Sequence, residues 1–313
     1  MKKKKDSNVK ITYIGGQAVI EGVMMRGRRM YAMAVRQPDG QLNVEKTFVA
    51  PASDKYPILK WPIVRGVAAF VDSLVMGMKL ISRSAEMAGL EEEVEGEPSK
   101  FEAFLTRVFG DKLNKAIMSF SVVIAVVLAV GLFMLLPVWI AGLFSGLRGH
   151  AWALGIVEGL IRIVIFVAYV ALVSLAKDIR RVYEYHGAEH KTINCYEHGQ
   201  ELTVENVSKF TRLHKRCGTS FLFIVMILAM LLLMLVQFKF IWLKLLSRII
   251  LIPVIAGLSY ELIRWAGRSD NWLVNAVSFP GLMLQKITTK EPDASEMEAA
   301  IAAMKAVLEN EPG

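Results

Sequence analysis

Two long runs without a charged residue constrain the fold of this chain most. Residues 117–144 contain no charged side chain over 28 residues, and residues 219–238 contain none over 20. A helix needs about 20 apolar residues to cross a hydrocarbon layer of about 30 Å. Segments 151–176 and 240–260 carry two charges each and still have the length of a span. The sequence therefore predicts an α-helical polytopic membrane protein with about four transmembrane helices.

The distribution of basic residues predicts the orientation of these helices. The net charge is +8, and lysine and arginine collect in the first 29 residues and in residues 177–218. Positively charged segments stay preferentially in the cytoplasm. Four spans with both termini cytoplasmic satisfy this rule. The basic charge does not indicate nucleic-acid binding, since no aromatic-interleaved pattern or recognition helix accompanies it.

The N-terminal region, residues 1–116, is expected to remain cytoplasmic, because no apolar signal core follows its lysine-rich start. Alternating segments around Asp39–Gly40 predict a β hairpin. Residues 61–81 have the length of a span, but charges recur there every seven residues along one helical face, which predicts an interfacial helix. The acidic stretch 91–100 reads as a linker. With the loop 177–218 and the C-terminal region 261–313, this region predicts a small cytoplasmic α+β part.

The loop between the second and third predicted spans holds four of the five histidines and both cysteines. His186-Gly-Ala-Glu189-His190 has the form H-x-x-E-H, which on a helix places both imidazoles on one face. That arrangement can bind one Zn²⁺, with Glu189 as general base and His214 or Cys217 as third ligand. The spacing predicts a metal site of the kind found in zinc hydrolases.

A second pattern in the same loop predicts a different metal site. Cys195-x-x-His198 and His214-x-x-Cys217 have the spacing of a closed, four-ligand structural zinc site, so Cys195 and His198 are alternative ligands. A cytoplasmic location makes a disulfide between the two cysteines unfavourable.

Other polar residues are candidates for function. Glu158 and Arg162 are four residues apart inside a predicted span, so they can pair on one helical face and mark either a functional path or a packing contact. In the glycine-containing stretch 15–27, Glu21 could orient a metal ligand and Arg26 could bind an anionic headgroup.

Four segments carry a resemblance to a known family: "GGQAVIEGVMMRG", "YHGAEHKTINCYE", "LHKRCGTSF" and "ITTKEPDASEMEAAIAAMKAVL". Together they resemble the YqhQ family of bacterial membrane proteins, a domain of unknown function described as a predicted metal-dependent enzyme. The resemblance covers essentially the whole chain and implies a location in the bacterial cytoplasmic (inner) membrane. The candidates that lie in its characteristic segments are His186, Glu189, His190, His214, Cys217, Glu21 and Arg26.

The chain departs from the family pattern at two places. Lys215 stands where a proline is expected, and His198 falls where no fixed histidine is expected, which weakens the four-ligand site.

Two functions remain open from the sequence. The first is a metal-dependent hydrolase at the cytoplasmic membrane face, acting on a membrane-associated substrate with Zn²⁺ as cofactor. The second is a non-catalytic membrane scaffold or transporter in which the metal only stabilises the loop. Glu189 has a chemical role in the first function and none in the second.

Overall fold

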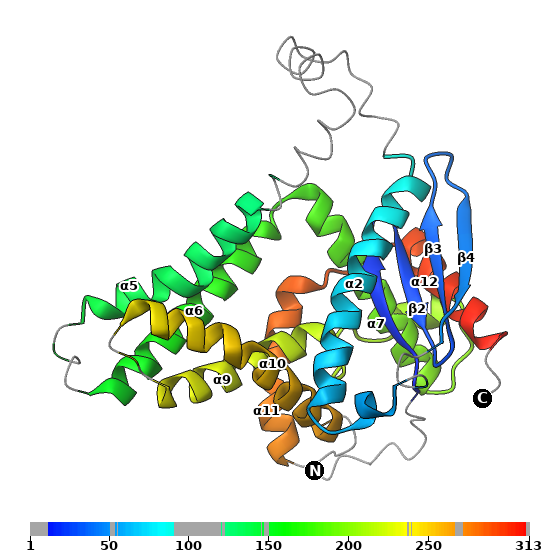
Figure 1. Cartoon of the computed structure of the whole chain (residues 1–313). Helices are drawn as coiled ribbons and strands as arrows, with labels where there is room; N and C mark the ends of the chain where they lie inside the picture. Colours follow the sequence, from blue (N-terminus) through cyan, green and yellow to red (C-terminus); the bar gives the residue numbers. More distant parts are fainter. Residues whose placement is uncertain are drawn as a thin grey trace, which may run out of the picture. The chain divides into compact units, whose positions relative to one another are not determined.

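The structure, a computed structural model, describes residues 12–50, 54, 56–90, 120, 123–144, 146, 150–236, 238, 240–266 and 272–310 (Figure 1). The chain forms two compact units. The first comprises Met1–Gly89, Val170–Val225 and Pro253–Gly313, and the second comprises Leu90–Tyr169 and Met226–Ile252. The predicted acidic linker 91–100 and the first residues of the first predicted span lie outside the described residues.

The first unit contains a four-stranded antiparallel sheet, in the order β1 (Gly15–Val19), β2 (Gly22–Arg26), β3 (Met30–Arg36) and β4 (Leu42–Phe48). Each strand pairs with the next, so the sheet is a meander. The loop between β3 and β4 contains the Asp39–Gly40 pair, with Gly40 at a φ of 85°, a conformation that glycine adopts without strain.

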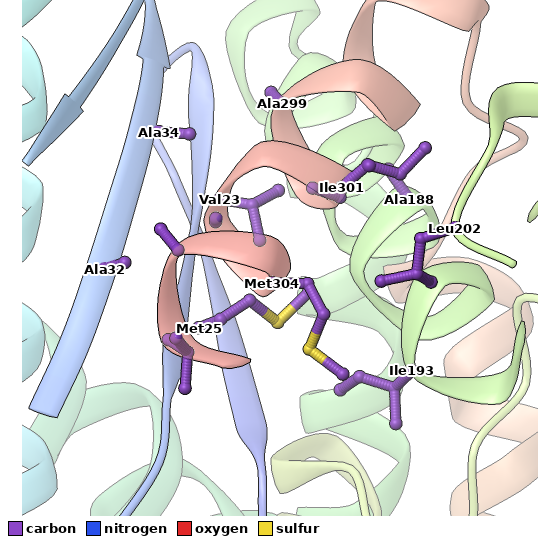
Figure 2. Close-up of a cluster of buried hydrophobic side chains, with 14 of the residues drawn as sticks. Val23, Met25, Ala32, Ala34, Ala188, Ile193, Leu202, Ala299, Ile301 and Met304 are labelled. Carbon is purple, nitrogen blue, oxygen red and sulfur yellow. The ribbon is translucent and has the colours of Figure 1, made fainter. Parts of the chain in front are cut away.

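Alternation along the strands gives this sheet two buried faces. Val23 and Met25 of β2 belong to the core shared with α7 (Lys177–Glu197), α8 (Val204–Ser208) and α12 (Ala294–Leu308) (Figure 2). Met24, between them, belongs to the core on the other face, which includes Leu80 and Met87 of α2 (Val64–Met87). Because successive side chains of a strand point to opposite faces, the first unit has helices on both sides of one sheet.

Helix α12 is fixed at its start and along one face. The Asp293 side chain accepts from the backbone of Glu296, whose carboxylate accepts from the backbone of Asp293, so the two residues form a capping box. Met297, Ile301 and Met304 follow at intervals of four and three residues and are buried. This apolar stripe packs α12 against β2, β3 and α7.

Helix α2 begins at Val64, three residues into the predicted interfacial segment 61–81, and continues beyond it to Met87. The short 3-10 helix η1 (Pro57–Lys60) precedes it. Helix α2 is not among the candidate spans of the described residues. Its charged residues make ion pairs: Asp72 with Arg26 and Arg65 with Glu261. One face is buried on the sheet, whereas Val71, Val75 and other apolar residues on the opposite face are exposed.

Three helical segments of the described residues are long and apolar enough to cross a membrane: Val123–Gly142, Trp152–Val173 and Trp242–Trp265. The first ends with the π-helix η3 (Gly131–Leu135) and α5 (Leu136–Gly142), and the other two lie in α6 (Ala151–Val173) and α10 (Ile241–Ala266). The chain is therefore mostly helical, with apolar helices and one small sheet.

The number of candidate spans differs from the four predicted. Helix α9 (Gly218–Leu235) occupies the third predicted span, 219–238, but its apolar part within the described residues is Leu222–Leu235. At 1.5 Å per residue this part extends about 21 Å, short of a hydrocarbon layer of about 30 Å. Helix α11 (Trp272–Thr288) follows α10 in the C-terminal region.

Candidate metal centre

Helix α7 carries the H-x-x-E-H motif and places its two histidines side by side. The imidazole centroids of His186 and His190 are 4.4 Å apart and the rings are inclined by 62°. The helix is held by its apolar face, where Tyr185, Ala188 and Ile193 are buried in the core next to the sheet. Residues one turn apart share a face of a helix, so the packing of α7 directs both rings to the same place.

Backbone carbonyls determine which nitrogen of each histidine is available. Nδ1 of His186 lies 2.9 Å from the carbonyl oxygen of Thr288, and Nδ1 of His190 lies 2.5 Å from that of Arg212. A carbonyl only accepts hydrogen bonds, so each Nδ1 must carry the proton and donate it. Burial also lowers the pKa of His190, which favours the neutral ring. Each Nε2 therefore keeps a lone pair for another partner.

Cys217 completes a group of three metal-ligating side chains. Its Sγ lies 3.2 Å from Nε2 of His186, and one ligand atom each of His186, His190 and Cys217 lies within 4.8 Å of the others. Cys217 directly precedes the first residue of α9, and its sulfur is 3.4 Å from the backbone nitrogen of Thr219 and 3.1 Å from its hydroxyl oxygen. The thiolate is the form of cysteine that binds metals.

The donor chemistry of this group fits Zn²⁺. Two imidazole nitrogens and one thiolate are ligands that zinc prefers, and three protein ligands leave one tetrahedral position for water or substrate. Backbone carbonyls that accept from Nδ1, as they do here for both rings, are the usual outer partners of metal-binding histidines. Both cysteines of the chain are free thiols.

Glu189 lies beside this group and is buried. Its Oε2 is 3.8 Å from Nε2 of His186. Burial raises the pKa of Glu189 to about 7, although the backbone hydrogen bond from Gly16 acts in the opposite direction. A Cβ built on Gly16 would lie 2.6 Å from Cγ of Glu189, so the carboxylate reaches this strand only because residue 16 is a glycine. A carboxylate with a pKa near neutrality is suited to general acid and base catalysis.

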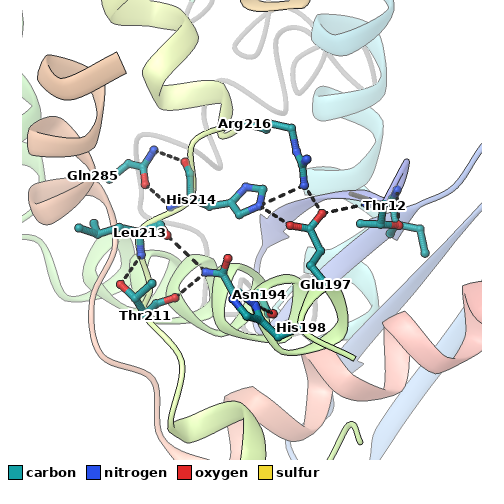
Figure 3. A network of polar contacts seen from close by, with 10 residues as sticks. Thr12, Asn194, Glu197, His198, Thr211, Leu213, His214, Arg216 and Gln285 are labelled. Atoms are coloured by element: carbon teal, nitrogen blue, oxygen red, sulfur yellow. Dashed lines mark hydrogen bonds and ion pairs between the residues drawn. The ribbon is translucent and has the colours of Figure 1, made fainter. Parts of the chain in front are cut away.

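His214 lies near the group but is held by other partners (Figure 3). Its ring centroid is 5.7 Å from that of His190. Gln285 fixes the backbone of His214 with two hydrogen bonds, accepting from its N–H at 2.9 Å and donating to its carbonyl at 2.8 Å. Nε2 of His214 lies 3.6 Å from Oε2 of Glu197, which also pairs with Arg216.

Glu197 is ionised in this network. Burial acts to raise its pKa, but the hydrogen bonds from His214 and the backbone of Thr12 and the charge of Arg216 outweigh burial and lower it. In this arrangement His214 is directed to the carboxylate of Glu197.

The alternative ligands Cys195 and His198 lie apart from the group of three. Cys195 is buried in the core next to the sheet, with its sulfur facing the carbonyls of Gln200 and Glu201. His198 donates from Nδ1 to the carbonyl of Asn194 at 2.7 Å, and its ring packs on Phe210. The structure does not bring these two residues together with His214 and Cys217.

Glu21 and Arg26 also make contacts away from the group. Glu21 lies in the turn between β1 and β2 with a φ of 51°, and pairs with Arg181 of α7. Arg26 pairs with Asp72 of α2 at 3.0 Å.

A second polar cluster occupies the second unit, and the predicted Glu158–Arg162 pair is part of it. Arg162 donates to Glu158 at 2.6 Å, Lys244 donates to the same carboxylate at 2.9 Å, and Arg248 donates to it as well. We call these four residues the Glu158 cluster. All four side chains are buried or nearly so. One carboxylate therefore serves three cations on α6 and α10.

The π-helix η3 contributes backbone acceptors to this cluster. Pro137 has no N–H to offer the carbonyl of Phe133, and that carbonyl accepts from Nε of Arg162 at 3.0 Å. The carbonyl of Met134 accepts from Arg248 at 3.3 Å. π-Helical turns expose carbonyls in this way and occur frequently at functional sites.

Several residues of these two sites were not predicted from the sequence: Gly16, Gln285, the carbonyls of Arg212 and Thr288, Lys244 and Arg248. Each reaches its partner from another part of the chain. The only local signals were the glycine pair at residues 15 and 16 and the two charges inside an otherwise apolar span.

Comparison with known proteins identifies the family. A family model described as "Protein of unknown function (DUF1385)" matches residues 61–310. The chain is 35% identical over 295 residues to "Uncharacterized protein YqhQ" of Bacillus subtilis (strain 168), covering 94% of this chain and 92% of that protein. No solved structure matches the chain. These matches, with the segments quoted above, show that the chain belongs to the YqhQ family of proteins of unknown function.

Proposed function

We propose that this chain is an integral protein of the bacterial inner membrane and a zinc-dependent hydrolase, with its site at the cytoplasmic membrane face. One observation carries the proposal. One ligand atom each of His186, His190 and Cys217 lies within 4.8 Å of the others, both Nδ1 atoms are held by carbonyls, and the buried carboxylate of Glu189 lies beside the group.

Each residue has a defined part in the proposed chemistry. His186, His190 and Cys217 hold the ion. When bound, Zn²⁺ supplies Lewis acidity and lowers the pKa of water toward neutrality. Glu189 takes the proton from the attacking water and returns it to the leaving group. The carbonyls of Thr288 and Arg212 keep both imidazoles in the ligating tautomer.

The membrane location is supported by the three long apolar helices and by the basic segments, which the positive-inside rule assigns to the cytoplasm. Helix α7, which carries the two histidines, follows the candidate span α6 closely in the sequence, and this favours a membrane-associated substrate.

The metal content of detergent-purified full-length protein tests the site. We expect near-stoichiometric zinc by elemental mass spectrometry in the wild type and in a double variant with Cys195→Ala and His198→Ala. A double variant with His186→Ala and His190→Ala should lose it. The proposed ligand set would be overturned if the Cys195→Ala, His198→Ala variant lost its zinc and the His186→Ala, His190→Ala variant kept it.

Glu189→Gln separates the hydrolase from the alternative, a membrane scaffold or transporter with a structural metal. The amide preserves the shape of the side chain and removes the base. We expect this variant to keep its zinc and to lose hydrolysis of extracted bacterial membrane components, followed by mass spectrometry of the products. A wild type that binds zinc and produces no product different from Glu189→Gln would favour the alternative.

A further inference from the structure

A polar cavity lies between β1, β2 and α2. Its volume is about 360 Å³, and its lining includes the backbones of Gly15 and Gly16 and the side chains of Gln17, Arg26 and Ser73. No acidic side chain lines it among the described residues. Arginine and hydroxyl donors beside exposed backbone form a setting suited to a phosphate group.

A second cation lies at the edge of the same cavity. The guanidinium of Arg28 stacks 4.1 Å from the ring centroid of Tyr13, which lines the cavity. The cavity therefore has one arginine in its wall and one at its edge, which favours an anionic ligand.

Gly16 connects this cavity with the candidate metal centre. It lines the cavity, and a Cβ at this position would lie 2.6 Å from Cγ of Glu189. The backbone of Gly16 therefore borders both the cavity and the side chain of Glu189, the proposed base. At the neighbouring residue, Gly15, a Cβ would meet nothing within 4 Å, so this side of Gly15 faces open space.

An apolar groove runs along the other side of α2. Its volume is about 620 Å³, and it is lined by residues that include Val67 and Val71 of α2 and Pro253 of α10. The two helices approach closely where Gly66 faces Gly257, since a Cβ on Gly66 would lie 2.8 Å from Cα of Gly257. Because α10 is a candidate span, the wall of the groove that α10 contributes is suited to contact with a hydrocarbon chain.

One turn of α2 joins the cavity to the groove. Asp72 lines the groove, and its carboxylate accepts from Nη1 of Arg26 at 3.0 Å. Ser73 and Met76, on the same turn, line the cavity. The Asp72–Arg26 pair therefore links a residue that lines the groove with a residue that lines the cavity, so the two spaces are neighbours along α2.

We propose that the ligand of this site is a lipid with a phosphate-bearing headgroup, with the phosphate in the cavity at Arg26 and an acyl chain in the groove along α2. The assignment of this lipid as a substrate rests on the hydrolase proposed above. Its assignment as a ligand rests only on the cavity, the groove and the Asp72–Arg26 ion pair. The class follows from a basic polar cavity and a neighbouring apolar groove, which are lined by the adjacent residues Ser73 and Asp72 of α2.

Calorimetric titration of full-length protein in detergent tests the binding site. The probes are dihexanoyl phosphatidate, inorganic phosphate and dihexanoylglycerol, which carry both parts, the anion alone and the chains alone. We expect the phosphatidate to bind at least about tenfold more tightly than either of the others. Equal affinity for inorganic phosphate would overturn the lipid assignment in favour of a simple anion site, and absence of phosphatidate binding would overturn the site itself.

Two matched variants test the role of the ion pair. Arg26→Gln removes the guanidinium and should weaken phosphatidate binding about tenfold or more. Asp72→Asn breaks the same ion pair but keeps the guanidinium, and should bind at least as tightly as the wild type. Equal weakening by both variants would show that the pair only supports the fold, against the proposal.

A third variant tests the groove. Ala68→Phe places a ring among the groove-lining residues and should weaken phosphatidate binding while leaving the response to inorganic phosphate unchanged. Phosphatidate binding is measured without reference to zinc content or turnover. A failure of the zinc and turnover experiments is therefore distinguishable from a failure of this proposal.

Discussion

The candidate metal centre and the Glu158 cluster both bury polar side chains, but they satisfy them differently. At the metal centre, carbonyls of Thr288 and Arg212 accept from neutral imidazoles at 2.9 and 2.5 Å. In the Glu158 cluster, one carboxylate accepts from three cations. The first site depends on the packing of backbone segments, and the second depends on a single charge.

This difference determines where each site is vulnerable. Removal of one partner from a buried ionic cluster leaves uncompensated charge, which is among the largest single-residue effects on stability. A site held by carbonyls is disturbed mainly by changes that move the backbone. The three predictions below test this contrast, in order of decreasing effect.

Glu158→Gln should have the largest effect. It leaves Arg162, Lys244 and Arg248 without their shared counter-charge and should lower the free energy of unfolding by about 3–5 kcal/mol. Thermal or denaturant unfolding in detergent, followed by circular dichroism, measures the change. Glu184→Gln is the control, because its pair with the exposed Arg180 should contribute no more than about 1 kcal/mol. Similar losses in both variants would contradict the contrast between the two sites.

Gly187→Ala should destabilise the metal centre although alanine favours a helix by about 1 kcal/mol. A Cβ at residue 187 would lie 2.0 Å from the carbonyl oxygen of Lys290, next to the segment that supplies the Thr288 carbonyl. We expect a net loss of about 1–3 kcal/mol from overpacking and a reduced zinc content.

Gly142→Ala is the control for this prediction, since a Cβ there meets nothing within 4 Å. It should leave both stability and zinc content unchanged or slightly increase stability. A Gly187→Ala protein as stable as the wild type, with full zinc content, would show that α7 does not depend on this close approach.

Glu296→Gln should have an effect that depends on pH and is smallest at acidic pH. Burial raises the pKa of Glu296 to about 7 from an ordinary value of 4.5. Between these values the folded protein keeps a proton that the unfolded chain releases, so stability falls as pH rises through this window. The slope attributable to one group is at most about 1.4 kcal/mol per pH unit.

Unfolding curves from pH 4 to 8 measure this dependence. Glutamine preserves the hydrogen bond to the backbone of Asp293 and should flatten the dependence, whereas Glu298→Gln, on the exposed side of α12, should leave it unchanged. The same slope in wild type and Glu296→Gln would assign the pH dependence to other groups.

The sequence predicted the parts of this molecule that depend on local pattern. The charge-free run at residues 117–144 predicted an apolar helix, and the spacing of His186 and His190 placed two rings on one helical face. Such features follow from helical periodicity alone.

The unpredicted parts depend on contacts between distant segments. The Thr288 carbonyl lies 102 residues along the chain from His186, and nothing in either segment signals the contact. The third predicted span, residues 219–238, has the right composition, but the chain leaves the helix after Leu235, and composition does not reveal where a helix ends.

The spacing of the Glu158 cluster along the chain has a consequence for biosynthesis. Lys244 follows Glu158 by 86 residues, and Arg248 follows it by 90. At translation rates of about 5–20 residues per second, the α6 segment is made roughly 4–17 s before Lys244. During this time Glu158 has Arg162, four residues away on its own helix, as a local partner. In the membrane location proposed above, this pair would let a nascent α6 enter the bilayer nearly neutral before α10 brings Lys244 and Arg248 to the same carboxylate.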